Sequence, residues 1–217
     1  DPEAEQLIAR RLELTAGVPA EIVDLVVARA EGNPFVAEEM VLVLRDAGAV
    51  VVKDGMATLS AARLAETRFP STLQGLVTAR LDRLPADQQP TVKYASVIGR
   101  SFGVDVLLGI HGGAVDRDEL LRQLRHLDDL RLTEQEADSV WSFRHAVIRE
   151  AAYELLPFVA RQRVHFAVAQ WYESNLAVVG TSALAILAWH YRMAGDAMRS
   201  LHWFERAGDH ALAQGAN

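Results

Sequence analysis

The sequence predicts a mainly α-helical protein with two short β-hairpins. Apolar residues recur at intervals of three and four along most of the 217 residues, which places them on single faces of α-helices. Strand-like runs occur in two short stretches, each interrupted by a turn. Half of the residues are hydrophobic and 7% are aromatic, a composition that suits a helical globular core.

The composition excludes several classes of function. The chain has no cysteine, so it holds no disulfide, no thiolate zinc site and no cysteine nucleophile, which is compatible with a reducing cytoplasm. No apolar run approaches the roughly 20 residues that span a bilayer, and the acidic first residues lack a signal-peptide pattern. The net charge of −7 opposes binding to nucleic acid and to anionic membranes. We therefore expect a cytoplasmic protein without a membrane partner.

Two amphipathic helices begin the chain, and the link Ala16–Pro19 separates them. Their apolar faces consist of Leu7, Ile8 and Leu12, then Ile22, Val23, Val26 and Val27. The second helix ends at Glu31-Gly32, where glycine suits a left-handed cap. Asn33 is then a favourable N-cap, and Pro34 is a favourable first residue of a third helix.

A β-hairpin is expected after the third helix. Ala49–Lys53 and Met56–Leu59 are β-prone runs, and Asp54-Gly55 between them is a strong turn signal. Either Ser71 or Thr72 is then expected to cap a further helix.

Three helices and a second β-hairpin are expected next, which is the order of elements in a winged helix. The helices carry Val92 to Ile98, Val104 to Ile110 and Leu120 to Leu127. Gly99–Gly103 is expected to form a turn between the first two helices. The hairpin consists of Arg131–Glu134 and Val140–Phe143.

The second hairpin runs into a helix that begins beside a candidate binding residue. Ser139–Phe143 alternates polar and apolar residues, as a strand does. The apolar side chains that follow share one helical face: Val147, Ile148, Ala151, Ala152 and Leu155. His145 lies at the junction of strand and helix, where its side chain can face a ligand while the backbone keeps its support. The simpler alternative is a hydrogen-bonded histidine at a helix start.

The last part of the chain is expected to be helical. Leu187–Tyr191, the turn Ala194–Asp196 and Ala207-Gly208 look like one tetratricopeptide-type helical hairpin. One such unit cannot bury its own apolar face, so we expect further repeats in a longer parent protein. Three tryptophans are expected to pack between helices: Trp171, Trp189 and Trp203.

Three stretches together resemble the region that follows the ATPase core in STAND-type signalling ATPases. They are Gly32–Glu39, Ala95–Phe102, and Phe143–Tyr153 with the trailing Arg163–His165. The likeness extends to the ATPase-like regulatory part of class III adenylate cyclases and of large LuxR-type regulators. It implies three domains: a helical lid with a β-hairpin at residues 1–85, a winged helix at 86–157, and helices leading into tetratricopeptide-like repeats at 158–217.

In that family a P-loop core binds ATP or ADP, and the resemblance implies nucleotide contacts for four residues here. Gly32, Asn33 and Pro34 match the glycine-x-proline motif of the lid, whose proline packs against adenine in relatives. His145 matches a winged-helix histidine that touches the nucleotide phosphates, although Ala146 replaces the aspartate of the related motif. The alternative is that the first three residues only end one helix and begin the next, as C-cap, N-cap and first helical position.

This segment is not expected to be an enzyme. It has no Gly-x-x-x-x-Gly-Lys-Ser/Thr loop, no strand that ends in a magnesium-binding pair of aspartates, and no catalytic dyad. We therefore expect no cofactor bound by this segment alone, with ATP or ADP held in the parent protein. The resemblance implies a regulatory segment that senses this nucleotide and relays a signal through protein contacts. Its partners would be its own N-terminal ATPase core, its C-terminal repeats and a further protein.

Two other functions are compatible with the sequence: a DNA-binding winged-helix transcriptional regulator, and a protein-binding scaffold that is independent of nucleotide. The expected recognition helix, residues 116–131, carries four arginines against five acidic residues, so its charge of about −1 opposes contacts to phosphates. A metal site is not expected, because the histidines of the last helices lie at scattered positions: His165, His190, His202 and His210.

Overall fold

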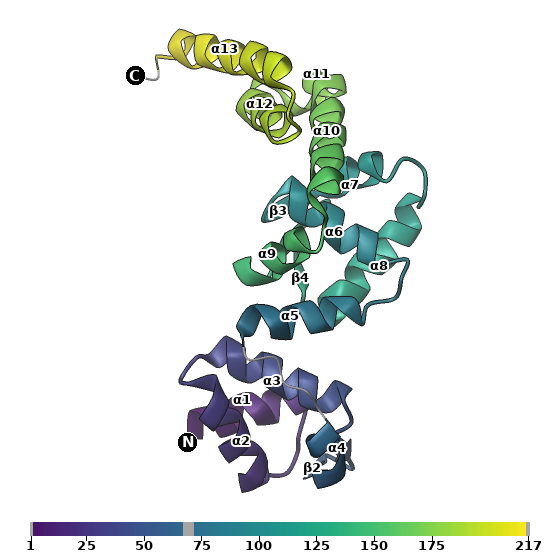
Figure 1. The fold of residues 1–217 in the computed structure, drawn as a ribbon, viewed down its shortest axis with the longest axis vertical. Helices are drawn as coiled ribbons and strands as arrows, with labels where there is room; N and C mark the ends of the chain where they lie inside the picture. Colours follow the sequence, from purple (N-terminus) through teal and green to yellow (C-terminus); the bar gives the residue numbers. More distant parts are fainter. Residues whose placement is uncertain (1, 67–71, 216–217) are drawn as a thin grey trace. The chain divides into compact units, whose positions relative to one another are not determined.

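The structure is a computed structural model that describes residues 2–66 and 72–215. The chain divides into two compact units, residues 1–83 and 84–217, and each is mainly helical with one small antiparallel sheet (Figure 1). A mainly helical fold with two small sheets is thus confirmed. Within the described ranges, every helix is too short or too polar to cross a bilayer.

The first unit is built around helix α3, which packs against α1, α2 and α5. A main core joins apolar side chains of α1, α2, α3 and the hairpin, among them Ile8, Ile22 and Leu44. The elements of this unit are α1 (Pro2–Leu12), α2 (Ala20–Ala30), α3 (Pro34–Asp46), β1 (Val50–Lys53), β2 (Met56–Leu59), α4 (Ala61–Glu66) and α5 (Leu73–Asp82).

The turn between α2 and α3 follows the predicted capping chemistry with one difference. The side-chain oxygen of Asn33 accepts hydrogen bonds from the backbone nitrogens of Phe35, at 3.0 Å, and Val36, at 3.4 Å, and Pro34 is the first helical residue. The C-cap of α2 is Glu31, which itself takes a left-handed conformation at φ 49°. Gly32 continues the reversal at φ 80°, a conformation that costs glycine little.

The first hairpin is confirmed at its predicted turn. Val50 pairs with Leu59 and Lys53 with Met56, and both residues of Asp54-Gly55 have positive φ, as a type I′ turn requires. The predicted cap Thr72 accepts a hydrogen bond from the backbone nitrogen of Gly75 at 3.1 Å. Ser71, the alternative cap, lies outside the described residues.

The second unit contains a three-stranded sheet of order β3-β5-β4. Its elements are α6 (Gln89–Ile98), β3 (Ser101–Gly103), α7 (Val104–Ile110), α8 (Arg117–Asp129), β4 (Thr133–Ala137), β5 (Val140–Phe143), α9 (Ala146–Glu154), α10 (Phe158–Ser174), α11 (Leu176–Val179), a 3-10 turn (Thr181–Ala183), α12 (Leu184–Met193) and α13 (Ala197–Ala213).

The prediction of a plain turn at residues 99–103 was wrong, because Ser101–Gly103 forms strand β3 beside the second hairpin. Phe102 lies opposite Trp141 on β5 and is buried with it. The rings of Phe102 and Phe143 are 5.6 Å apart. A strand of three residues is too short to show a period of two, so burial of Phe102 against distant aromatic residues decides its conformation.

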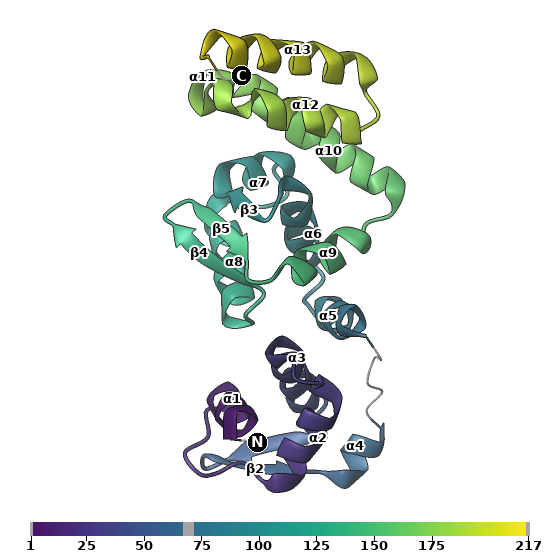
Figure 2. The same cartoon turned by 90° about the vertical axis from the view of Figure 1, so that its left-hand side faces the viewer.

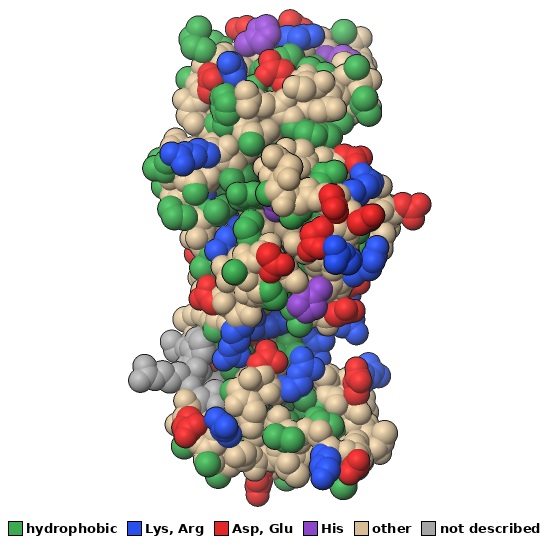
Figure 3. Space-filling view, turned by 90° about the vertical axis from the view of Figure 1, so that its right-hand side faces the viewer, with side chains coloured by type: hydrophobic (Ala, Val, Ile, Leu, Met, Phe, Trp, Pro, Cys, Tyr) green, Lys and Arg blue, Asp and Glu red, His purple; other side chains and the backbone are tan. Residues whose placement is uncertain are grey.

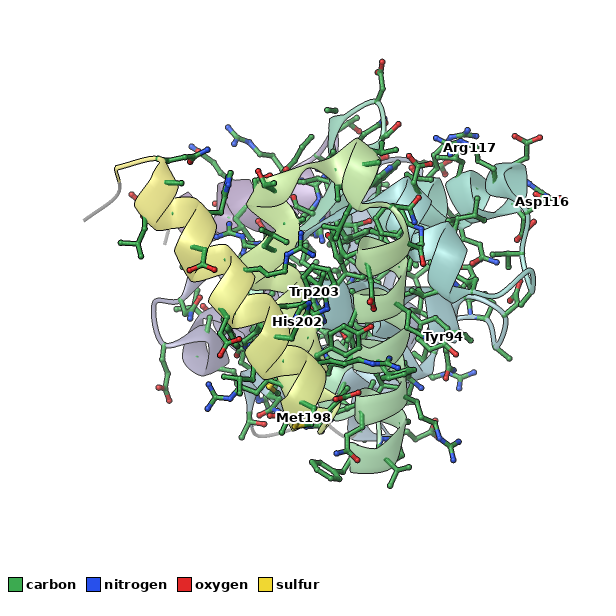
Figure 4. All side chains as sticks on the ribbon, turned by 90° about the horizontal axis from the view of Figure 1, so that it is seen from above. Tyr94, Asp116, Arg117, Met198, His202 and Trp203 are labelled. Atoms are coloured by element: carbon green, nitrogen blue, oxygen red, sulfur yellow. The ribbon has the colours of Figure 1, made fainter. Side chains whose placement is uncertain are left out.

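The last helices form a layer in which α12 packs against both α10 and α13 (Figure 2). Seen from above, Trp203 points from α13 toward the other helices, whereas Met198 lies at the first turn and is largely exposed (Figure 4). Trp203 joins a core cluster with Leu187, Ala188 and Tyr191 of α12, as a tryptophan that packs between helices should.

Helices α7 and α10 approach closely at Gly109. A Cβ atom at this position would collide with the Trp171 indole, so the absence of a side chain permits the contact. Gly208 on α13 has open space instead, since an added Cβ would meet no atom within 4 Å. These two helical glycines therefore form a matched pair for a test of packing.

We predict that Gly109→Ala lowers the free energy of unfolding by about 1–3 kcal/mol, because the indole must move out of its packed position. Gly208→Ala should instead raise it by up to about 1 kcal/mol, since alanine favours a helix over glycine. Urea unfolding of both variants and the parent chain checks this, and equal effects of the two substitutions would contradict the close approach.

Candidate functional site

A pocket of about 340 Å³ opens in the first unit where α1, α2 and the start of α3 meet. This volume lies at the lower end of the range for small-molecule sites. The residues that line it are Glu3, Ala4, Leu7, Val27, Ala30, Gly32, Asn33, Pro34 and Ala37. Most of these side chains are apolar, and Glu3 supplies the one carboxylate among the described residues of the lining.

The tight reversal between α2 and α3 builds one side of this pocket. Because Asn33 caps α3 with its side-chain oxygen, the following Pro34 is held at the first helical position, where its ring is exposed. Ala37 lies about one turn further along α3 and lines the pocket as well. The arrangement can receive a flat, mostly apolar group, and the amide nitrogen of Asn33 can supply a donor.

Three of the four sequence-predicted site residues thus meet in one pocket: Gly32, Asn33 and Pro34. The capping role, which was the alternative interpretation of these residues, is present in full, so capping and pocket lining occur together. The pocket also contains residues that the sequence did not single out as site residues, among them Glu3 and Val27 on the two preceding helices. Their role depends on how α1 and α2 pack, which no local motif reports.

His145, the fourth predicted residue, belongs to the second unit. It precedes the first residue of α9 with an extended backbone, φ −135° and ψ 142°, and it is solvent-exposed. Its position at a junction between strand and helix is confirmed. Its contact with phosphate stays a prediction.

Arg144 fixes the backbone just before His145. Its guanidinium group donates to the backbone oxygen of Thr133 at 3.0 Å and to Asp128 at 2.7 Å, and it lies 3.2 Å from Glu134. One side chain therefore joins α8, β4 and the junction that presents His145. These partners lie 10 to 16 residues away in the sequence, so no local pattern around Arg144 predicts them.

A buried histidine pair lies between α10 and α12, where the sequence suggested only scattered positions. The Nδ1 atoms of His165 and His190 are 2.9 Å apart, and the Nε2 atom of His165 is 3.0 Å from the Tyr153 hydroxyl. Both histidines are fully buried. Twenty-five residues separate them in sequence, so no local spacing predicts their contact.

Burial keeps both imidazoles neutral. It lowers the pKa of His165 to about 4, with a smaller contribution from Arg149. It lowers the pKa of His190 to about 3, with a smaller contribution from His165. The Nε2 atom of His190 has no hydrogen-bond partner among the described residues. The described part of the chain also has no group of three or more potential metal ligands.

The exposed charges of α8 are mixed in sign. Arg117 contacts Asp105 at 2.5 Å, and Arg122 contacts Glu119 at 2.5 Å. Figure 3 shows acidic and basic side chains interspersed on the face of the second unit that includes α8. Arginines that pair with carboxylates neutralise fewer nucleic-acid phosphates.

Comparison with known proteins gives one partial match. A family model described as a domain of unknown function (DUF8739) matches residues 1–58, a range that includes the described residues that line the pocket. No curated protein and no solved structure matches the chain.

The histidine pair predicts acid sensitivity of the second unit. The pKa values of both histidines are lower in the folded chain than the usual 6.5, so their stabilising contribution is complete above pH 6.5 and is lost as the pH falls toward 4 and 3. Between pH 7 and pH 5 we expect a loss of about 2–4 kcal/mol in the free energy of unfolding.

Urea unfolding at a series of pH values measures this loss. The variant that carries both His165→Leu and His190→Leu should show a much flatter pH dependence between pH 7 and pH 5. His202→Leu, which removes an exposed histidine of α13, should behave as the parent chain does. An unchanged pH profile in the double variant would contradict burial of neutral imidazoles.

Proposed function

We propose that this chain is a non-catalytic regulatory segment of a STAND-type ATPase. In this role the first unit contacts a nucleotide held mainly by a P-loop core, and the second unit relays the nucleotide state to other proteins. The observation that carries the proposal is the pocket lined by Gly32, Asn33 and Pro34, the three residues of the lid motif.

The chemistry of the pocket supports an adenine ring as the group received. The Pro34 ring offers an apolar surface for one face of the base, while Leu7 and Val27 supply apolar walls. The Glu3 carboxylate can accept a hydrogen bond from an exocyclic amine, and its charge would disfavour a phosphate at the same place. The phosphates would therefore lie outside this pocket, toward the proposed core.

Without a phosphate cradle, adenine contacts alone give weak binding. The favourable free energy of a small apolar contact is only slightly larger than the entropic cost of association, so little net affinity is left. We therefore expect the parent protein to have two arrangements of its domains, in which ATP and ADP make different contacts. The pocket would contribute by binding the adenine ring more tightly in one arrangement than in the other.

The second unit supplies elements suited to the relay. The order α6, β3, α7, α8, β4, β5 supports a winged helix, and the hairpin of α12 and α13 supports the start of a tetratricopeptide-like array. Among the alternatives, DNA binding is disfavoured by the paired arginines of α8. A scaffold that is independent of nucleotide would use the same surfaces but would bind its partner equally with ATP and ADP.

We predict that adenosine at millimolar concentration protects the backbone amides of residues 35–37 from hydrogen exchange, because the base covers the start of α3. Pro34→Ala removes apolar contact worth on the order of 1 kcal/mol and should weaken adenosine binding about fivefold. Pro157→Ala, at the exposed start of α10, is the matched control and should leave the affinity unchanged.

Adenosine avoids any contribution from phosphates, so the measurement isolates the pocket. Exchange monitored by mass spectrometry over an adenosine titration gives the affinity of each variant. Absence of protection at the start of α3, or equal affinities for the two proline variants, would contradict adenine binding by Pro34.

A further inference from the structure

One buried ion pair joins α3 to α5 in the first unit. The Nη1 atom of Arg80 lies 2.5 Å from Oε1 and 2.6 Å from Oε2 of Glu39. The exposed fraction is 1% for Glu39 and 7% for Arg80. Both charges have therefore left water, and the two charges compensate each other.

The apolar contacts that accompany this ion pair form a cluster of their own. Leu76 of α5 packs against Met40 and Val43 of α3, with half-buried Val36 at the edge. The main core of the unit instead joins α1, α2, α3, the hairpin and the half-buried Leu64 of α4. Helix α5 thus shares a small apolar cluster with α3, and Val77 and Leu81 of α5 are buried as well.

An exposed ion pair also joins the ends of α3 and α5, but it contributes little to the stability of their contact. Arg83 and Asp46 are 3.9 Å apart, and their side chains are 47% and 35% exposed, so solvent screens their attraction. Of these two ion pairs, the buried one between Glu39 and Arg80 therefore contributes more to the contact between α3 and α5.

Because of the buried ion pair, the contact between α3 and α5 has two favourable states, closed and open, with unfavourable intermediates between them. When the pair is closed, both charges are compensated, and when the helices separate, both are hydrated. An intermediate that leaves one charge buried without its partner is strongly disfavoured. Contacts of this kind open as a whole and close as a whole.

We propose that Glu39 and Arg80 form a latch that holds α5 on α3, and that α5 releases as a unit while the main core of α1–α3 stays folded. The chain passes from α5 into the second unit at Leu84, so release lengthens the connection between the main core and the second unit. This inference stands on the α3–α5 contacts and does not require the proposed nucleotide contact.

Native-state hydrogen exchange of the whole chain at low urea concentrations tests the latch in the unaltered protein. We expect the amides of residues 76–82 to exchange through an opening that exposes less surface than global unfolding does. The amides of α1 and α2 should require a larger opening. A single opening shared by α1, α2 and α5 would overturn the proposal.

Substitution of one partner should open the latch. In Glu39→Gln the amides of residues 76–82 should exchange about a hundredfold faster or more, because Arg80 loses its compensating charge. The amides of α1 and α2 should keep their rates. Glu66→Gln is the control, since it removes an exposed ion pair with Arg63, at 3.7 Å, in the same unit.

The double variant Glu39→Leu with Arg80→Met separates a latch from a general loss of structure. It removes both charges and keeps apolar contact, so the protection of residues 76–82 should return to at least that of the unaltered chain. Three results would overturn the latch: faster exchange throughout α1–α3 in Glu39→Gln, unchanged exchange of α5 in that variant, or a double variant no better protected than the single one.

Discussion

The reversal between α2 and α3 constrains the whole first unit, because a helix must satisfy the hydrogen-bonding groups at its ends before it can pack. Glu31 and Gly32 turn the chain in the left-handed region, and Asn33 then supplies the acceptor that the first turn of α3 needs. This fixes the direction of α3, whose successive faces meet the pocket, the main core and α5. A substitution that alters this turn would therefore disturb the pocket, the main core and the contact with α5 together.

The second unit depends on a different kind of constraint, in which distant residues hold short elements in place. Phe102 makes a three-residue strand possible by packing against aromatic residues of β5. Arg144 ties the junction before His145 to both α8 and β4. The region that carries the predicted phosphate contact is thus supported from several elements, as a site that must keep its geometry requires.

The features that the sequence predicted are those whose cause is local. The turn at Asp54-Gly55 and the caps at Asn33 and Thr72 follow from the preferences of adjacent residues, and the structure contains all three. The strand at Ser101–Gly103 and the contact between His165 and His190 escaped prediction because their causes are packing partners far along the chain. The stretch Gly32-Asn33-Pro34 located one side of the pocket, whereas the contributions of Glu3 and Val27 depend on tertiary packing.

The neutral imidazoles between α10 and α12 have a consequence for spectroscopy. Each contact in the series Tyr153, His165, His190 holds one hydrogen, so the ring nitrogens of each histidine are chemically unlike. Their tautomers are linked, since the direction of one hydrogen bond fixes the direction of the next. Nitrogen chemical shifts of two side chains would therefore report the register of α10 against α12 without any attached label.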